Sequence, residues 1–473
     1  MLWTALYFSE LPLAVFARAG TGAVPAVVSS ASHRPDVVVA NDAAKKRGIV
    51  AGLSIAAALS LDPEIAIHLR DERTEAAALK SIALWAGQWT STISIEPPAG
   101  VLLEISGCLN YFGGLDTLLA RIDAGLAALG FCGVVATAPT ARAASLLARS
   151  GQAIAIERAT DLEPWLEALP AALLDNARSV LDTLTGIGVR TIGDVLALPR
   201  DGVARRFGPG LLEEIDRARG IQPDPRPLFV APERYHGQLE LPAPVTEAEA
   251  LLFAAKRLIV ELAGFLHGRS AGVTRLRCDL IHEDAAPTSI VLGLAATRRI
   301  EHMVNVLRER LARETLPDRV ESIRLVSEEI APLAMQEGEL FPGADRRGGS
   351  GAQWIERLRA RLGDGAVREP CLQGDHRPEQ ASHYRGEAPM AAARLPAASP
   401  LRPLWLLSRP RPLGADPAAA QLTLLSGPER IESGWWDGGE IGRDYFVGSD
   451  ARGTALWLYR DRGGAWFVHG IFA

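Results

Sequence analysis

The chain has 473 residues, of which 48% are hydrophobic and 22% are charged, and its net charge is −6. This length and hydrophobic content predict about three or four domains with real cores and exclude a protein that is disordered as a whole. The negative net charge excludes a protein that coats nucleic acid over its entire surface, so any DNA contact must come from local basic surfaces.

The cysteines and the N-terminus indicate the cellular compartment in which we expect the protein. No CxxC pair occurs among the four cysteines, which are Cys108, Cys132, Cys278 and Cys371. We therefore expect no disulfide framework and no metal site, as is typical of a reducing cytosol. The apolar N-terminal run is interrupted by Glu10 and Pro12, and no basic residue precedes it. This pattern indicates a core strand rather than a signal peptide or a membrane span.

Strands and helices interleave in the first part of the chain. Residues 2–8 are typical of a buried strand, and further along the chain one helix ends near Gly48 and a second is terminated by Asp62-Pro63. Two short β-like runs, STISI and VLLEIS, flank a Pro/Gly turn at residues 96–100, which predicts a hairpin. Further helices surround a strand at GVVATA, so we expect a mixed α/β layer.

The pattern becomes all-helical at about residue 164 and stays so to about residue 220. The helices there are short, and the turn Gly186-Ile187-Gly188 separates two of them. The proline-rich residues 223–232 then indicate a linker.

A new domain is predicted to begin at Thr246, which with Glu249 forms a capping-box pattern at the start of a helix. The run VTRLRCDL alternates, which places Leu276, Cys278 and Leu280 on one face of a half-buried strand. The opposite face carries the charged residues Arg275, Arg277 and Asp279. An element order of helix, strand, strand, helix, strand predicts a two-layer α+β domain.

The chain becomes rich in glycine and proline after residue 333. One short helix, QWIERLRARLG, interrupts this segment, with Trp354, Leu358 and Leu362 on one face. The last 50 or so residues predict short aromatic strands joined by glycine turns.

Several of these segments resemble Y-family translesion DNA polymerases in the family's order. VLLEISGCLNYFGG resembles the second palm strand, NDAAKKRGIVAGLSIAAALSLDPE the fingers, and GVRTIGDVLAL the thumb. Later segments, above all GPERIESGWWDG and the terminal WFVHGIFA, resemble the C-terminal region of ImuB-type proteins, a catalytically inactive branch of that family. The resemblance covers essentially the whole chain.

The resemblance implies a fold class, α/β and α+β multidomain, and a set of domains. We expect a palm over residues 1–165 with fingers inserted at about 30–75, a helical thumb with a helix-hairpin-helix-like turn over 166–225, and a little finger over 235–333. A flexible segment over 334–400 holds a clamp-binding-like motif and the arginine-rich helix. An ImuB-type region over 401–473 completes the chain.

The family's catalytic carboxylates are missing from the matching positions. Nucleotidyl transfer needs two divalent cations held by convergent carboxylates. The resemblance places the positions of these ligands at Tyr7, Ala99 and Gly100, none of which carries a carboxylate. The neighbouring carboxylates that could be recruited instead are Glu10, Glu96 and Glu104. We interpret these three as ordinary solvated or structural residues, so the sequence predicts no catalysis, no metal and no cofactor.

The residues that bind the incoming nucleotide in the family are also replaced. The family's triphosphate-binding tyrosine and arginine match Asp42 and Lys45, and a family lysine matches Ala141. A carboxylate repels a triphosphate, and lysine lacks the planar fork of arginine.

Two groups of residues are candidates for DNA contact. Amides of the Gly186–Gly188 turn could face a phosphate, although glycines of this kind also end helices in the ordinary way. Arg275 and Arg277 on the strand face, with Arg298 and Arg299 before the next helix, could follow phosphates.

The run QEGELF resembles the short motif by which bacterial polymerases dock on the β sliding clamp. Gln336 would hydrogen-bond at the rim of a pocket that Leu340 and Phe341 fill. Its spacing is six residues rather than the common five.

The resemblance implies a non-catalytic factor in damage-induced (SOS) translesion synthesis, in the cytoplasm and on the nucleoid at damaged DNA. Its partners would be DNA, the β clamp, an error-prone polymerase III α-type subunit and an ImuA-like protein of the RecA fold, with recruitment expected between about Trp354 and Ala473. Two alternatives stay open. One is an active Y-family polymerase that uses relocated carboxylates, and the other is a DNA-binding protein without polymerase partners.

Overall fold

The structure is a computed structural model that describes residues 1–18, 26–30, 33–175, 178–333, 351–384, 402–414 and 416–472. The chain divides into two compact units, Met1–Arg361 and Leu362–Ala473. Each unit is described by itself.

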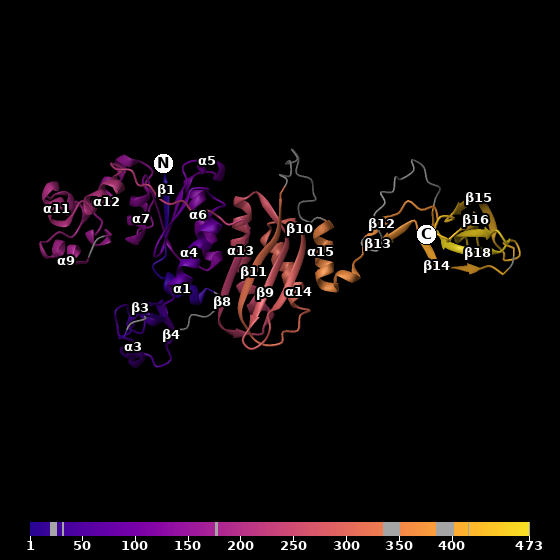
Figure 1. Cartoon of the computed structure of the whole chain (residues 1–473), viewed down its shortest axis with the longest axis horizontal. Helices are drawn as coiled ribbons and strands as arrows, with labels where there is room; N and C mark the ends of the chain where they lie inside the picture. The colour runs from indigo at the N-terminus through magenta and orange to yellow at the C-terminus, as the bar shows by residue number, and fades with distance from the viewer. Residues whose placement is uncertain are drawn as a thin grey trace. The chain divides into compact units, whose positions relative to one another are not determined.

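A four-stranded antiparallel sheet lies at the centre of the first part of the N-terminal unit, in the order β5-β6-β1-β7 (Figure 1). Its strands are β1 (Trp3–Tyr7), β5 (Ile93–Glu96), β6 (Gly100–Glu104) and β7 (Val134–Ala138). Because successive side chains point to opposite faces, Leu6 joins one core and Ala5 the other. One face packs against α1 (Leu11–Ala17), α4 (Glu72–Ala86), α5 (Leu109–Phe112) and α6 (Leu115–Leu129), and the other against α7 (Ala141–Arg149).

A smaller sheet is inserted after α1. Its order is β3-β2-β4, with β2 (Ala26–Ser29) antiparallel to β3 (Val37–Ala40) and parallel to β4 (Ala66–Leu69). Two short helices, α2 (Asp42–Lys45) and α3 (Ile55–Leu61), lie between β3 and β4. Each helix begins at a side-chain cap, because Asn41 accepts from the amide of Ala44 and Ser54 from that of Ala57.

A helical part follows α7 and shares its core. It consists of the 3₁₀ turns η1 (Ala159–Asp161) and η2 (Ala171–Leu173) and the helices α8 (Glu163–Glu167), α9 (Arg178–Gly186), α10 (Ile192–Leu196), α11 (Arg200–Phe207) and α12 (Gly210–Arg219). The proline-rich residues after α12 form no helix or strand, as expected of a linker, but they are not free of the protein. The amide of Phe229 donates to the carbonyl of Ile93 on β5 at 2.7 Å.

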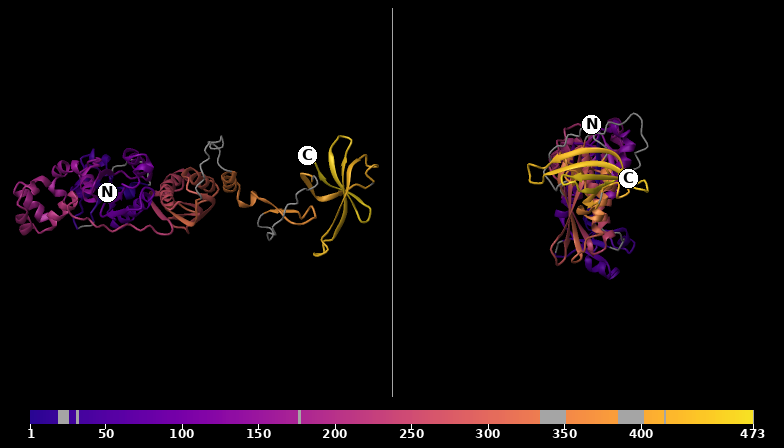
Figure 2. Two further views of the ribbon diagram at one scale, coloured as in Figure 1. Left: turned by 90° about the horizontal axis from the view of Figure 1, so that it is seen from above. Right: turned by 90° about the vertical axis from the view of Figure 1, so that its right-hand side faces the viewer.

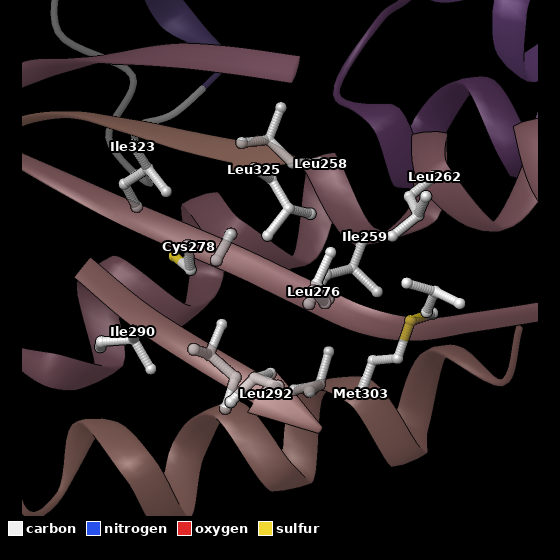
Figure 3. Packing of buried hydrophobic residues seen from close by; sticks show 14 of the residues in the cluster. Leu258, Ile259, Leu262, Leu276, Cys278, Ile290, Leu292, Met303, Ile323 and Leu325 are labelled. Atoms are coloured by element: carbon white, nitrogen blue, oxygen red, sulfur yellow. The ribbon is translucent and has the colours of Figure 1, made fainter. Parts of the chain in front are cut away.

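The second large sheet is antiparallel, in the order β10-β9-β11-β8. It is built from β8 (His236–Val245), β9 (Ala271–His282), β10 (Thr288–Thr297) and β11 (Val320–Pro332), with α13 (Ala248–Gly268) and α14 (Ile300–Leu311) on its apolar face. Figure 3 shows Leu276 and Cys278 of β9 packed against α13 and α14 side chains. The predicted alternation is confirmed, because Leu276, Cys278 and Leu280 are all buried.

Two expectations for this domain are wrong. Helix α13 begins at Ala248 with Glu247 as its N-cap and no side-chain cap hydrogen bond, so Thr246 and Glu249 form no capping box. The predicted order begins with a helix at Thr246 and lacks the strand β8, which contains Pro242 and Pro244. They are tolerated because β8 is an edge strand and both prolines lie where its pairing with β11 shifts register, between Glu240 and Val245.

Helix α15 (Gly351–Leu362) packs against this second sheet. The Glu356 carboxylate accepts from the amide of Ala295 on β10 and pairs with His302 of α14. Ala360 joins the domain core, and its carbonyl accepts from Arg313 at 3.3 Å. The arginine-rich helix therefore belongs to the N-terminal unit.

The C-terminal unit is built on a five-stranded antiparallel sheet, in the order β14-β18-β17-β16-β15. Its strands are β14 (Trp405–Pro412), β15 (Thr423–Ser433), β16 (Ile441–Ser449), β17 (Ala455–Asp461) and β18 (Trp466–Ile471). In Figure 2 these strands fan out, because the sheet is strongly twisted. A 3₁₀ turn, η4 (Asp364–Ala366), and the pair β12 (Pro370–Leu372) and β13 (Ser382–Tyr384) precede it. The expectation of aromatic strands with glycine turns is confirmed.

The predicted fold class, a multidomain chain with α/β and α+β parts, is confirmed by these sheets and helices. Among the described residues, no helix combines the length and the apolar character that a membrane crossing requires. The individual domain boundaries stay predictions.

The Trp85 side chain of α4 lies between helix α6, which packs on the central sheet, and helix α13, which packs on the second large sheet. It is 2% exposed, and a glycine from each of two other helices gives it room. A Cβ atom added at Gly125 of α6 would lie 2.2 Å from Trp85 Cζ2, and one at Gly264 of α13 would lie 2.7 Å from Trp85 Cδ1.

We predict that Gly125→Ala lowers the melting temperature, measured by circular dichroism. Overpacking costs about 1–3 kcal/mol, which outweighs the gain of about 1 kcal/mol from helix propensity. The matched control is Gly202→Ala in α11, where the nearest atom to an added Cβ is 4.0 Å away. This control should leave the melting temperature unchanged or raise it, and equal effects of the two changes would contradict the packing argument.

Candidate functional site: the β1–β6 edge and its arginines

The structure brings together the three positions at which the resemblance places catalytic carboxylates. Tyr7 on β1 pairs directly with Gly100 on β6, and the amide of Phe8 donates to the carbonyl of Ala99 at 2.9 Å. The β5–β6 hairpin predicted from STISI and VLLEIS creates this juxtaposition, since it folds the turn before Gly100 back to the end of β1. Tyr7, Ala99 and Gly100 thus lie at one edge of the sheet.

A cavity of about 150 Å³ opens at this edge. Its lining includes the three positions above and residues from α7 and the segment before α9; the polar members are Glu96, Ser145, Arg149 and Asp175. Glu96 and Asp175 are the acidic groups that line it.

Both of these carboxylates are already paired with arginine side chains. The buried guanidinium of Arg142 lies 3.0 Å from Glu96 and 2.7 Å from Asp175, and it also pairs with Glu214 on α12. A second arginine binds each carboxylate: Arg226 lies 3.4 Å from Glu96 and Arg149 lies 2.9 Å from Asp175. We call these six residues the Arg142 cluster: Arg142, Arg149 and Arg226 with Glu96, Asp175 and Glu214.

The protonation of the Arg142 cluster follows from its burial and its pairing. Burial by itself would raise the pKa of Asp175, but the hydrogen bond and charge of Arg142 lower it overall. Burial raises the pKa of Glu214, and the pairing with Arg142 offsets only part of this effect. Glu214 also accepts from the amide of Asp175 at 2.9 Å, so it fixes the backbone as well as the guanidinium.

Sequence reasoning missed the Arg142 cluster. It assigned Ala141 as the position of a lost lysine and did not consider the next residue. The signal was present, because Arg142 is an arginine within the otherwise apolar first turns of α7, where a buried charge requires partners.

The remaining acidic candidates lie elsewhere. Glu10 pairs with Lys45 at 2.5 Å, and both side chains are nearly half exposed. Glu104 lies at the opposite end of β6, where it is opposite Trp3 in the β1–β6 register. This position is about 13 Å from Gly100 at the usual rise per residue. There it accepts from the amides of Leu2 and Ser106.

These residues do not fit a two-metal site. Among the described residues, no group of three or more His, Cys, Asp or Glu side chains is placed to hold a metal ion. The two acidic groups that line the cavity, Glu96 and Asp175, are already paired with the Arg142 guanidinium.

The residues at the family's triphosphate-binding positions, Asp42, Lys45 and Ala141, make local contacts. Asp42 begins α2 and is exposed, and it lies 3.3 Å from Lys45. The hydrogen bond to Glu10 raises the pKa of Lys45, so this amine is charged and already paired. Ala141 is the first residue of α7, which is capped by Thr140.

The Gly186–Gly188 turn ends helix α9. Gly188 has a φ of +88°, and the amides of Ile187, Gly188 and Val189 donate to carbonyls of the last turns of the helix. The next two amides, of Arg190 and Thr191, donate to Asp194 at the start of α10. This is the helix-ending arrangement that the sequence left open as the alternative. Phosphate binding by the turn stays a prediction.

Arg275 and Arg277 lie on the polar face of β9, as expected, but they are not free. Both pair with Glu328 of β11, at 2.7 Å and 3.5 Å, and Arg277 also lies 3.4 Å from Asp279. DNA contact by these two arginines stays a prediction, and it would require exchange of these ion pairs. The clamp-like residues Gln336, Leu340 and Phe341 lie outside the described residues.

The chain is similar to several known proteins. No family model matches the chain. Of the solved structures that match it, a post-insertion binary complex of Dbh DNA polymerase is 18% identical and covers 70% of this chain and 99% of its own, with a TM-score of 0.41. DinB from Sulfolobus solfataricus is 19% identical, with 69% and 98% covered and a TM-score of 0.39.

Among curated proteins, Protein ImuB from two strains of Caulobacter vibrioides, NA1000 / CB15N and ATCC 19089 / CIP 103742 / CB 15, is 26% identical over 457 residues. The match covers 90% of this chain and all of the curated protein. The resemblance seen in the motifs is therefore confirmed: this chain is similar to Protein ImuB along nearly its whole length.

Proposed function

We propose that the protein is a non-catalytic, polymerase-like factor in damage-induced mutagenic translesion synthesis. It binds DNA and links the β sliding clamp to an error-prone polymerase III α-type subunit and to an ImuA-like partner. The observation that carries the non-catalytic part is the β1–β6 edge, where Tyr7, Ala99 and Gly100 meet without a carboxylate among them.

The Arg142 cluster supports this proposal. Two-metal catalysis requires carboxylates that are free to bind cations and that converge on the reacting phosphate. Glu96 and Asp175 are each bound by two guanidinium groups, and Arg149 also lines the cavity. The lining of the cavity also argues against the alternative of an active polymerase with relocated carboxylates, because Glu96 lines it and neither Glu10 nor Glu104 does.

The first functional prediction is that the purified protein does not extend a primer. The assay uses a primed template, all four nucleotides and magnesium or manganese, and a mobility-shift assay on the same sample reports DNA binding. We expect bound DNA and no extension above the control without protein, because no bound cation would stabilise the charge of the transition state. Extension that disappears in Glu10→Gln or Glu104→Gln would instead favour the active-polymerase alternative. These two residues are chosen because neither belongs to the Arg142 cluster.

The second prediction concerns partner recruitment, which we propose for the C-terminal unit. The sequence places recruitment from about Trp354 onwards, but α15 packs into the N-terminal unit through Glu356 and Ala360. The informative truncation therefore ends the chain after Leu362, at the boundary of the two units. We expect the shortened chain to keep DNA and clamp binding and to lose the polymerase subunit or the ImuA-like protein in a pull-down with purified partners. If the shortened chain retains both partners, recruitment does not lie in this unit.

The third prediction concerns the clamp. Two apolar anchors supply most of the affinity of an extended docking peptide, so the double change Leu340→Ala and Phe341→Ala should abolish clamp binding in calorimetry. The control is Glu339→Ala within the same motif, which removes neither anchor and should bind within about threefold of the unchanged chain. Unchanged affinity in the double variant would place the clamp contact elsewhere.

A further inference from the structure

The arginines of the N-terminal unit differ in whether an acidic group neutralises them. Arg275 and Arg277 share Glu328, and the three arginines of the Arg142 cluster are paired as well. By contrast, Arg299, Arg357 and Arg361 form no ion pair within the part of the chain that the structure describes. Arg357 and Arg361 belong to α15, and Arg299 is the N-cap residue of α14.

Arg299 and Arg357 line a cleft of about 170 Å³ between α14 and α15, several times the roughly 30 Å³ of one water molecule. The cleft is lined by Arg299, Glu301, His302 and Asn305 from the α14 side and by Gln353, Trp354 and Arg357 from α15. The docking of α15 fixes its walls, because the Glu356 carboxylate binds both His302 and the amide of Ala295. The cleft is thus part of the folded unit.

One face of α15 combines an aromatic ring with positive charge. Trp354, Arg357 and Arg361 are spaced three and four residues apart, so they share a face of the helix. The Trp354 side chain is 56% exposed, and the Arg357 guanidinium lies over its ring at 5.4 Å. The Nε atom of Arg357 is buried without a hydrogen-bond partner in the described structure.

We infer that this α14–α15 cleft binds single-stranded DNA. Nucleobases stack on exposed aromatic rings, and arginines beside the ring bind the phosphates, which together form the usual platform for a single strand. Asn305 and Gln353 provide amides that can hydrogen-bond a base edge. The Glu301 carboxylate, which also lines the cleft, can accept from an exocyclic amine and would repel a bare phosphate, so it favours a base at that point.

The neighbouring face of the same helix offers a different chemistry. Ile355, Leu358 and Leu362 are between 42% and 55% exposed and carry no charge. An apolar face of this kind fits a protein partner better than a nucleic acid. The charged face with Trp354 favours DNA because its groups are cationic, planar and unpaired.

The test is fluorescence anisotropy with the full chain, using a labelled mixed-sequence single strand and the corresponding duplex at several salt concentrations. We expect the double change Arg357→Gln and Arg361→Gln to weaken single-strand binding about tenfold and to lower the slope of log affinity against log salt by about 1.4, at about 0.7 for each lost phosphate contact. Trp354→Ala should weaken it by at least about fivefold, with a smaller effect on duplex, whose bases are already stacked.

Controls separate charge, folding and partner effects. Arg359→Gln changes an arginine on another face of α15 and should bind within about twofold of the unchanged chain. Arg357→Lys with Arg361→Lys should keep the salt slope, and the melting temperature of each variant reports whether α15 stays folded. Single-strand affinity that is equal in the unchanged chain and the glutamine double variant would overturn the inference.

The inference rests on the proposed function in so far as the chain binds DNA, and the same titration separates the two. If the unchanged chain binds neither strand form, DNA binding itself fails, and this site with it. If the chain binds DNA but the cleft variants lose only a pull-down partner, this face of α15 is a protein-docking face and the single-strand assignment is wrong.

Discussion

The Arg142 guanidinium connects three stretches of the N-terminal unit that are far apart in sequence: Glu96 at the end of β5, Asp175 before α9 and Glu214 in α12. Removing one partner of a buried ion pair typically costs about 3–5 kcal/mol, because the other charge stays buried and uncompensated. The central sheet, the helical part and the linker that contributes Arg226 therefore depend on one another through this cluster. A site with charges bound in this way is suited to holding shape rather than to exchanging cations.

This constraint separates structural from functional arginines in the rest of the unit. The three arginines of the Arg142 cluster, Arg275 and Arg277 are paired with acidic groups, in a chain that has 56 acidic and 50 basic residues. A net negative protein that meets DNA must concentrate unpaired positive charge in a small area. The contrast between Arg275, which is bound to Glu328, and Arg357, which lies over Trp354, is the kind of difference that composition cannot reveal.

The sequence predicted what local periodicity controls. The alternation around Leu276 and the turn between β5 and β6 followed from spacing, and the fold class followed from the order of such segments. It could not predict what depends on long-range partners. Strand β8 was hidden by its prolines until its edge position was known, and the role of Arg142 depends on carboxylates 33 to 72 residues away. The pairing of Arg275 with Glu328 likewise spans 53 residues and follows only from strand register.

The contact between Glu356 and the amide of Ala295 has a consequence for the solubility of the protein. Strand β10 is an outer strand of its sheet, and an open row of amides and carbonyls on such a strand can pair with another molecule. Helix α15 lies against this strand and satisfies one of those amides with a side chain instead. Fragments that end before residue 351 would present β10 bare, and their tendency to self-associate would reflect the missing helix rather than any biological assembly.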